Sequence, residues 1–175
     1  MSPQGRPKGE FPPGGTARSA KSAPVSAGAP MANYAAAKRA GDFVFLSGVV
    51  AVDALRQMAL SRYEELPESA RQSLRGLGYD TGQMSVDVLE APIVTQSWFV
   101  LDRIQQLAQE QGGGMADAIK LVQYFRDLRH YPAFNRVRGL FYPTEAPVST
   151  VVEVSRFLPG DSVLVEVEAT LYLPR

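Results

Sequence analysis

The sequence contains no cysteine and a single histidine, His130, in its 175 residues. The absence of cysteine excludes disulfide bonds, thiolate nucleophiles and thiolate metal sites, and it fits a reducing compartment. A single histidine argues against a His-based triad and against a multi-histidine metal centre. No apolar run approaches the ~20 residues that cross a bilayer. We therefore expect a cytoplasmic protein without membrane contact or metal, whose chemistry rests on carboxylates, arginines, hydroxyls and backbone groups.

Charge of one sign is not in excess either, because 18 Lys and Arg residues balance 18 Asp and Glu residues. No overall basic field attracts phosphates, which argues against a nucleic-acid partner. Residues 1–29 are rich in Pro, Gly, Ser and Ala, and Phe11 and Val25 are their only sizeable apolar residues. Such a segment buries too little surface to offset the entropy of ordering. The sequence predicts an N-terminal tail or strap over residues 1–29 and one domain over residues 30–175.

From residue 30 onward, apolar periodicity predicts regular elements. Strands are expected at 34–38, 43–52, 118–125, 148–155 and 162–173, and helices at 68–77, at 93–111 and from Pro132 onward. Residues 54–91 have the weakest pattern and are interpreted as an insertion. The order ββαβαββ predicts an α+β fold in which helices pack on one face of a single sheet.

The last strand carries the clearest pattern. One of its faces is apolar, and the other carries Glu166 and Glu168. A two-residue hairpin turn at Pro159-Gly160 would place Glu153 opposite Glu166, with Ser149 and Val151 on the same face. Opposed carboxylates repel, so that one of them would hold a proton near neutral pH. Alternatively, both acids face solvent or pair with arginines of a neighbouring subunit.

Several segments, taken in order, resemble one known family. They are KRAGDFVFLSG at 38–48, YFRDLRHYPAFNRVRGLF at 124–141, and VEVEA at 165–169. This set is similar to the YjgF/Rid (reactive intermediate deaminase) family over residues 30–175, and the opening PMANYAAAKRAGDFVFLSG resembles its 2-aminomuconate deaminase branch. The resemblance implies a chorismate-mutase-like fold and a homotrimer with three clefts at its subunit interfaces. It also implies hydrolysis of enamines and imines without a cofactor, although other members are described as ribonucleases.

The resemblance also implies a set of site residues. Glu166 matches the acidic residue that positions water, and the substrate-binding positions correspond to Tyr34, Ser47, Gly48, Asn135, Ser149 and Val151. At Ser149 the family has an arginine that grips the substrate carboxylate, and serine cannot replace a charged bidentate fork. Arg138, at i+3 from Asn135, is a candidate substitute cation; alternatively it is a solvated arginine or forms an interface salt bridge.

Two classes of function remain open at this level. One is a divergent imine or enamine deaminase with an altered substrate, and the other is a non-catalytic trimer that binds a small metabolite. An RNA-cleaving or RNA-binding protein is a weaker alternative. The loss of the family arginine favours a changed substrate or simple binding, whereas the retained Glu166, Asn135 and Tyr34 favour a working pocket.

Overall fold

The computed structural model describes residues 32–175, so the expected tail at residues 1–29 lies outside the described residues. Its main sheet has the strand order β1-β2-β8-β6-β7. The strands are β1 Ala37–Ala40, β2 Phe43–Leu46, β6 Ala118–Phe125, β7 Val148–Glu153 and β8 Val165–Tyr172. The short β3 (Val49–Val50) also pairs with β8. Among the strands of residues 32–175, only β6 and β7 run parallel, because α4 connects them as a crossover.

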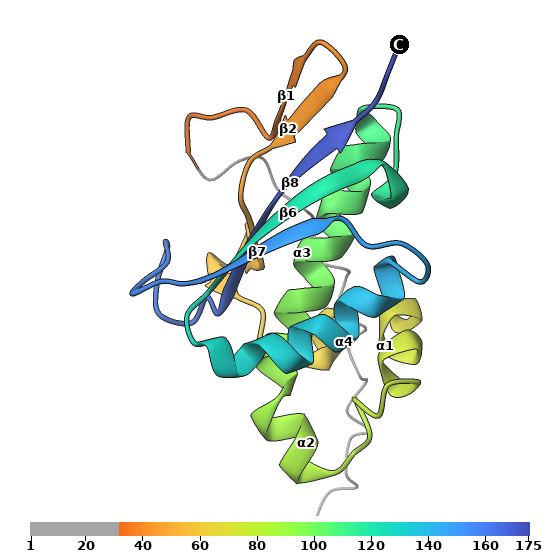
Figure 1. The fold of residues 1–175 in the computed structure, drawn as a ribbon. Helices are drawn as coiled ribbons and strands as arrows, with labels where there is room; N and C mark the ends of the chain where they lie inside the picture. The colour runs from red at the N-terminus through yellow and green to blue at the C-terminus, as the bar shows by residue number, and fades with distance from the viewer. Residues whose placement is uncertain (1–31) are drawn as a thin grey trace, which may run out of the picture.

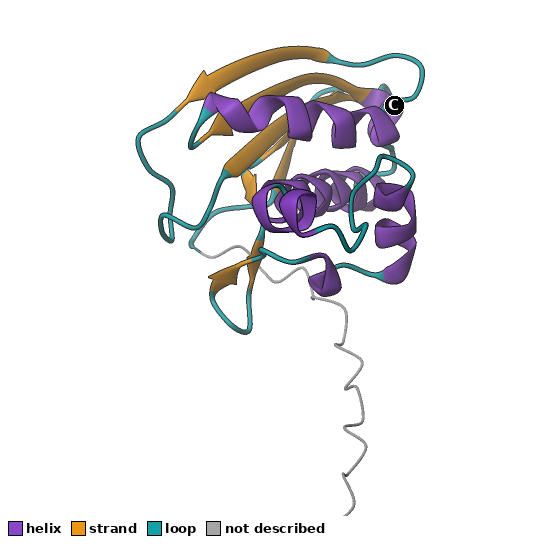
Figure 2. Cartoon of the chain, turned by 90° about the horizontal axis from the view of Figure 1, so that it is seen from below, coloured by secondary structure: helices purple, strands orange, loops and turns teal. Residues whose placement is uncertain are grey.

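The helices gather on one face of this sheet (Figures 1 and 2). They are α1 Glu68–Arg75, α2 Met84–Leu89, α3 Ala91–Glu110 and α4 Tyr131–Phe141. Phe125 of β6 packs edge-on against Phe134 of α4, with ring centroids 5.3 Å apart. Leu101 and Ile104 of α3 are fully buried. The α+β architecture with helices on one face is therefore confirmed.

The alternation of β8 matches the sequence prediction. Val165, Val167 and Leu171 have no exposed surface and face the helices. Glu166 and Glu168 are half-buried on the opposite side of the sheet, which we call the open face. Phe45 and Tyr124 share this face because they pair in register with Thr170 and Glu166, respectively. A small apolar cluster of Val52, Phe157 and Val163 closes one end of the sheet.

The predicted hairpin between the last two strands is wrong. β6 lies between β7 and β8, and residues 154–164 form a long connection in place of a two-residue turn. Glu153 therefore pairs with Phe125, whereas Glu166 pairs with Tyr124. The two carboxylates are not opposed. Period-two alternation identifies the faces of a strand but not its neighbour, and this is why the pairing was missed.

The N-terminal strands also differ from the expectation. β1 begins at Ala37, and the expected long strand at 43–52 is divided into β2, β3 and β4 (Val52–Asp53). β4 forms a separate two-stranded sheet with β5 (Met58–Ala59). The break at residues 47–48 lies where the Glu166 side chain approaches the backbone of Gly48. A continued strand with a side chain at this position would collide with that carboxylate.

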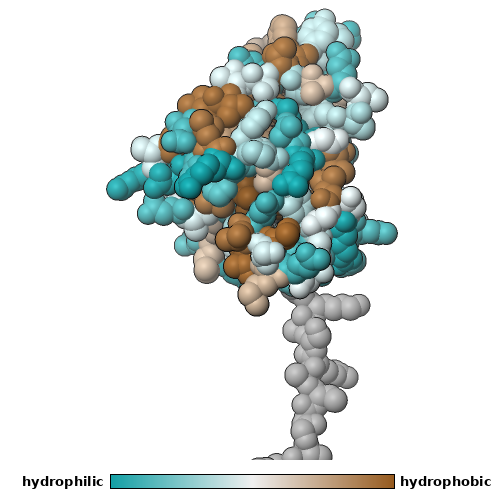
Figure 3. Space-filling view, turned by 60° about the horizontal axis from the view of Figure 1, so that its bottom comes forward, coloured by the Kyte–Doolittle hydropathy of each residue, from teal (hydrophilic) through white to brown (hydrophobic). Residues whose placement is uncertain are grey.

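The segment at residues 54–91, interpreted from the sequence as an insertion, contributes to the core. It contains β5, α1, α2 and the 3-10 turn η1 (Tyr63–Glu65). Seven of its buried side chains belong to the main apolar cluster, namely Leu60, Tyr63, Leu66, Ala70, Leu74, Tyr79 and Ala91. The expected helix at 68–77 is α1, which ends at Arg75, while α2 was not predicted. On the end of the molecule shown in Figure 3, apolar residues form separate spots divided by polar side chains.

Candidate functional site

The carboxylate of Glu166 lies directly over Gly48. A Cβ at residue 48 would stand 1.8 Å from Oε1 of Glu166 and 2.8 Å from its carboxyl carbon. Real Cβ atoms do not approach other atoms so closely, so the position requires glycine while the carboxylate remains there. The glycine of the Ser47-Gly48 pair therefore has a structural explanation, because the Glu166 side chain of β8 rests on the backbone that follows β2.

Ser47 fixes the segment that follows Tyr34. Its backbone N–H donates to the Ala36 carbonyl at 3.0 Å, and its hydroxyl donates to the Ala35 carbonyl at 2.7 Å. Tyr34 itself is 45% exposed at the start of the described chain. Ser47, Gly48 and Glu166 are thus neighbours in the fold, and Tyr34 lies on the segment that Ser47 holds; we call these four residues the Glu166 group.

The surroundings of Glu166 favour its protonated form. Burial raises the pKa of Glu166 above its ordinary value, and the charge of Glu168 on the same face raises it further. The expected like-charge partner Glu153 is not involved. A carboxylate whose pKa is raised is a stronger proton acceptor, which suits a group that takes a proton from water and returns it during a reaction.

Tyr124 belongs beside Glu166, although it was not among the sequence candidates. The two residues pair in register between β6 and β8. The pKa of Tyr124 is raised by burial, and then by the charges of Glu168 and Glu166. Its phenol is therefore neutral and available as a hydrogen-bond donor. The signal was present in the alternation of residues 118–125, but only the pairing with β8 shows that Tyr124 reaches the glutamates.

A second group forms around Arg138 on α4. Its guanidinium donates from Nη2 to Oδ1 of Asn135 at 2.6 Å and from Nη1 to Oγ of Ser149 at 3.5 Å. Val151 follows two residues later on β7 and packs against the core. Asn135, Arg138, Ser149 and Val151 are the Arg138 group. Within residues 32–175 no carboxylate forms an ion pair with Arg138, so its remaining N–H groups can meet an anion.

Arg136 connects α4 to the insertion. Its guanidinium lies over the ring of Tyr79 at 5.0 Å from the centroid, and its Nη2 is 3.2 Å from Oε2 of Glu90. A stacked cation of this kind contributes roughly 0.5–1 kcal/mol at an exposed site. The helix that carries Asn135 and Arg138 is therefore anchored to the segment around α2.

The two groups lie on opposite faces of the sheet. Ser149 and Val151 pair in register with Leu121 and Gln123, which are fully buried beneath the helices. Glu166 pairs with Tyr124 on the open face. The expectation that Ser149 and Val151 share the face of Glu166 is therefore wrong. Within one chain, the Glu166 group lies on one face of the sheet and the Arg138 group lies on the other, so the two halves of the expected site do not meet.

The described residues contain no cluster of three or more acidic or histidine side chains that would hold a metal ion. They also contain no helix long and apolar enough to cross a membrane. The fold and these two groups define a class of protein: an α+β chain with one helix-covered face and polar groups on both sides of its sheet.

Comparison with known proteins identifies the family. Residues 73–173 match the sequence model described as Endoribonuclease L-PSP, and the chain belongs to this family, which is the YjgF/Rid family of the sequence resemblance. A RutC family protein of Pyrococcus abyssi is 27% identical over 143 residues, which cover 82% of this chain and 88% of that protein. A RutC family protein of Synechocystis is 29% identical over 115 residues, or 62% of this chain and 87% of that protein.

Solved structures agree with this assignment. A candidate endoribonuclease from Klebsiella pneumoniae is 50% identical and has a TM-score of 0.75, covering 81% of this chain and 100% of that one. RidA from an Antarctic Psychrobacter is 19% identical with a TM-score of 0.61, covering 88% and 96%, respectively. The second likeness concerns the fold alone.

Proposed function

We propose that copies of this chain assemble as a homotrimer with the chorismate-mutase-like arrangement, and that each cleft between them hydrolyses the C=N bond of a small imine or its enamine tautomer. The observation that carries the proposal is the position of the Glu166 carboxylate directly above Gly48. A carboxylate held by burial, with a raised pKa, suits proton transfer to and from water.

The placement of the two groups on opposite faces supports a cleft between subunits. A second copy packed on the open face would carry its own Arg138 group to the rim of the first copy's sheet. The open face has the composition of an interface, because Phe43, Phe45 and Tyr172 are all more than 40% exposed in the single chain. Exposed aromatic side chains on one face are typical of surfaces that bind another protein chain.

The reaction needs only residues of these two groups and Tyr124. Glu166 accepts a proton from water as the oxygen adds to the carbon of the protonated imine, which gives a neutral carbinolamine. Glu166 then returns this proton to the nitrogen, the C–N bond breaks as ammonia leaves, and the hydroxyl proton passes to Glu166 as the carbonyl forms. Tyr124 and Asn135 supply polar contacts around the reacting atoms. Positioning of water and substrate provides the rate gain, so no cofactor is required.

Arg138 takes the place of the missing family arginine. Its Nη1 lies 3.5 Å from the hydroxyl of Ser149, the residue that stands where the family has its arginine. Because the cation projects from α4, and not from β7, the anionic end of the substrate would lie in a different place. We therefore propose an altered substrate that still carries an acidic group.

A mixing experiment tests both the reaction and the location of the cleft. Glu166→Gln should abolish hydrolysis of imines generated in situ by an amino-acid oxidase, and Arg138→Ala should lower it tenfold or more. Co-expressed or co-refolded 1:1, the two variants should recover about one quarter of the parent activity, since each site draws one group from each of two neighbours in a symmetric ring. Glu110→Gln, an exposed change on α3, serves as the control.

A non-catalytic metabolite-binding protein is the second candidate. It is favoured by Ser149, which is uncharged, and by Asn135, which already occupies one edge of the Arg138 guanidinium. Imines with and without a carboxylate, together with an aminomuconate-type enamine, distinguish the two candidates. Hydrolysis of none of them by the parent protein would overturn the enzymatic proposal and leave the binding function. Failure of the mixed variants to regain activity would contradict the shared cleft.

A further inference from the structure

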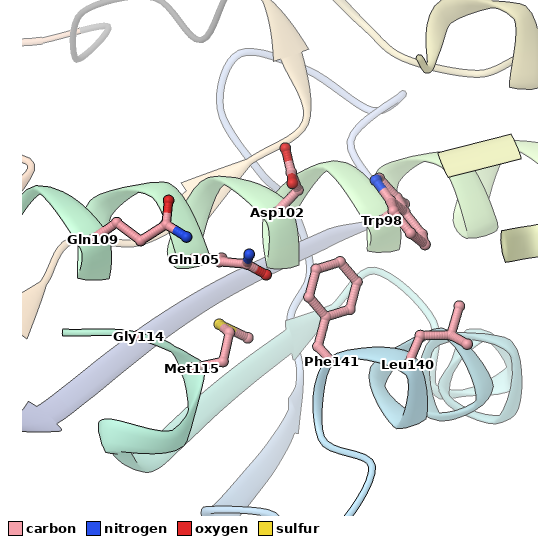
Figure 4. Close-up of a pocket in the computed structure, with 8 residues that line it drawn as sticks. All are labelled: Trp98, Asp102, Gln105, Gln109, Gly114, Met115, Leu140 and Phe141. Atoms are coloured by element: carbon pink, nitrogen blue, oxygen red, sulfur yellow. The ribbon is translucent and has the colours of Figure 1, made fainter. Parts of the chain in front are cut away.

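A separate cavity of about 460 Å³ lies between α3, the end of α4 and the 3-10 turn η2 (Met115–Asp117) (Figure 4). The residues that line it are Trp98, Asp102, Gln105, Gln109, Gly114, Met115, Leu140 and Phe141. None of them belongs to the Glu166 group or the Arg138 group. A volume of this size suits a small organic ligand. The proposed deaminase chemistry does not use this cavity.

The apolar part of the cavity is already ordered by contacts within the chain. The rings of Trp98 and Phe141 meet edge-on, with centroids 5.0 Å apart and an interplanar angle of 61°. Met115 is 8% exposed, and its sulfur accepts a long hydrogen bond of 3.9 Å from the Tyr142 hydroxyl. These side chains form a preformed apolar wall that would contact a flat ligand without reordering.

The polar part of the cavity carries one charge only. Gln105 lies on the side of α3 that faces Met115 and Phe141, whereas the carboxylate of Asp102 points away from these two residues, at the edge of the cavity (Figure 4). Among the described residues that line the cavity, Asp102 is the single ionisable group, and none is a lysine or an arginine. Its field attracts a positive charge.

Asp102 has no cationic partner within residues 32–175. Its Oδ2 accepts a hydrogen bond of 2.8 Å from the amide of Gln106. The neighbouring Arg103 is directed elsewhere, to Glu110 at 3.1 Å and to the side-chain oxygen of Gln106 at 3.3 Å. A half-buried carboxylate without a counter-ion, one helical turn from an indole ring, is the arrangement that recognises ammonium groups.

We propose that this cavity is a second ligand site, which binds a small organic cation: a primary or quaternary amine attached to a flat apolar body. The ammonium group lies between Asp102 and Trp98, and the apolar body lies against Met115 and Phe141. Gln105 and Gln109 contribute hydrogen bonds to polar substituents. Burial raises the pKa of Asp102, which means that the carboxylate has already lost part of its hydration, so a bound cation would restore favourable interactions.

The chain offers a direct readout, because Trp98 is its only tryptophan. Full-length protein is titrated with benzylammonium chloride while heat and Trp98 fluorescence are recorded. Benzyl alcohol and benzoate are the controls, since they keep the ring and replace the ammonium by a neutral or a negative group. We expect benzylammonium to bind with a change in Trp98 fluorescence, and benzyl alcohol to bind at least tenfold more weakly.

Two variants test whether the Asp102 carboxylate is the charge that binds benzylammonium. Asp102→Asn keeps the shape of the side chain and should weaken benzylammonium binding tenfold or more. Glu110→Gln removes a negative charge from the same helix outside the cavity and should change the affinity less than twofold. The proposal is overturned if benzylammonium does not bind at millimolar concentration, if benzyl alcohol binds equally well, or if Asp102→Asn binds as the parent does. Thermal melts of both variants establish that they are folded.

Discussion

The carboxylate of Glu166 rests on Gly48, 118 positions earlier in the chain, at a distance that leaves no room for a Cβ. This contact joins the break between β2 and β3 to the centre of β8. It holds the carboxylate away from solvent beside Glu168, and so accounts for the raised pKa of Glu166. The strand geometry and the proposed chemistry therefore depend on the same contact.

The first prediction is that Gly48→Ala displaces the Glu166 carboxylate. The overpacked methyl group should cost about 1–3 kcal/mol of stability and reduce any hydrolytic activity at least tenfold. Glu166→Asp shortens the side chain, so combining it with Gly48→Ala should restore stability but not activity. Gly160→Ala is the matched control, because a Cβ there meets nothing within 4 Å. Equal melting temperatures for Gly48→Ala and Gly160→Ala would contradict the close contact.

The second prediction concerns Glu166→Gln and pH. Because the folded-state pKa of Glu166 is raised, ionisation destabilises the folded protein as pH rises through the ordinary glutamate value of about 4.3 and on to the folded-state value. Below that range both states are protonated and the penalty vanishes. Glu166→Gln should therefore raise the melting temperature by a few degrees at pH 8, with the difference shrinking toward zero near pH 4.

Glu110→Gln provides the comparison in the same thermal scans. Its carboxylate is exposed and lies 3.1 Å from Arg103, so its removal should not stabilise the protein at any pH. A lower melting temperature for Glu166→Gln than for the parent at pH 8 would mean that Glu166 is paired in the assembled protein, and would overturn this prediction.

Much of the fold could be predicted from sequence because the apolar residues of its longest helix and strand recur at regular helical or strand spacing. The apolar spacing of Val94, Leu101 and Ile104 identified α3, and the alternation around Val165 and Val167 identified the faces of β8. The i+3 spacing of Asn135 and Arg138 indicated that they share one side of a helix, and the structure joins them by a hydrogen bond. These features depend on local geometry alone.

The remainder depends on partners distant in sequence. Nothing near Pro159 indicates that β6 lies between β7 and β8, so the hairpin and the shared face of Ser149 and Glu166 were wrong. α2 was missed because Met84, Val88 and Leu89 are all exposed, and its six residues therefore show no buried stripe. Tyr124 reaches Glu166 only through the pairing of β6 with β8.

The third prediction is that the chain forms a trimer of three times 19.0 kDa, measured by analytical ultracentrifugation. Phe45→Asp places a charge on the open face, where Phe45 is 51% exposed in the single chain, and should dissociate the trimer. Burying an unpaired carboxylate in an apolar interface is strongly unfavourable. Val88→Asp on α2, where the parent residue is 65% exposed, should leave the assembly intact. A monomeric parent protein, or dissociation by both variants alike, would contradict the interface on the open face.

The last prediction concerns variants that move the cation of the Arg138 group from residue 138 to residue 149. The parent should hydrolyse 2-iminobutanoate slowly, because Arg138 reaches Ser149 from α4 and its Nη2 is occupied by Asn135. Arg138→Gln should lower kcat/KM further, by about tenfold or more, since a hydrogen bond to a charged group contributes roughly 1.5–3 kcal/mol. Adding Ser149→Arg in that background should recover activity, because the guanidinium then projects from β7 without a second cation beside it. Ser149→Arg alone should recover less, as two guanidinium groups would repel one another.

Stopped-flow measurement of imine decay gives the rates of the parent and of the three variants. Fast hydrolysis by the parent, or no gain in the double variant over Arg138→Gln, would show that the anion-binding position has not moved in the way proposed.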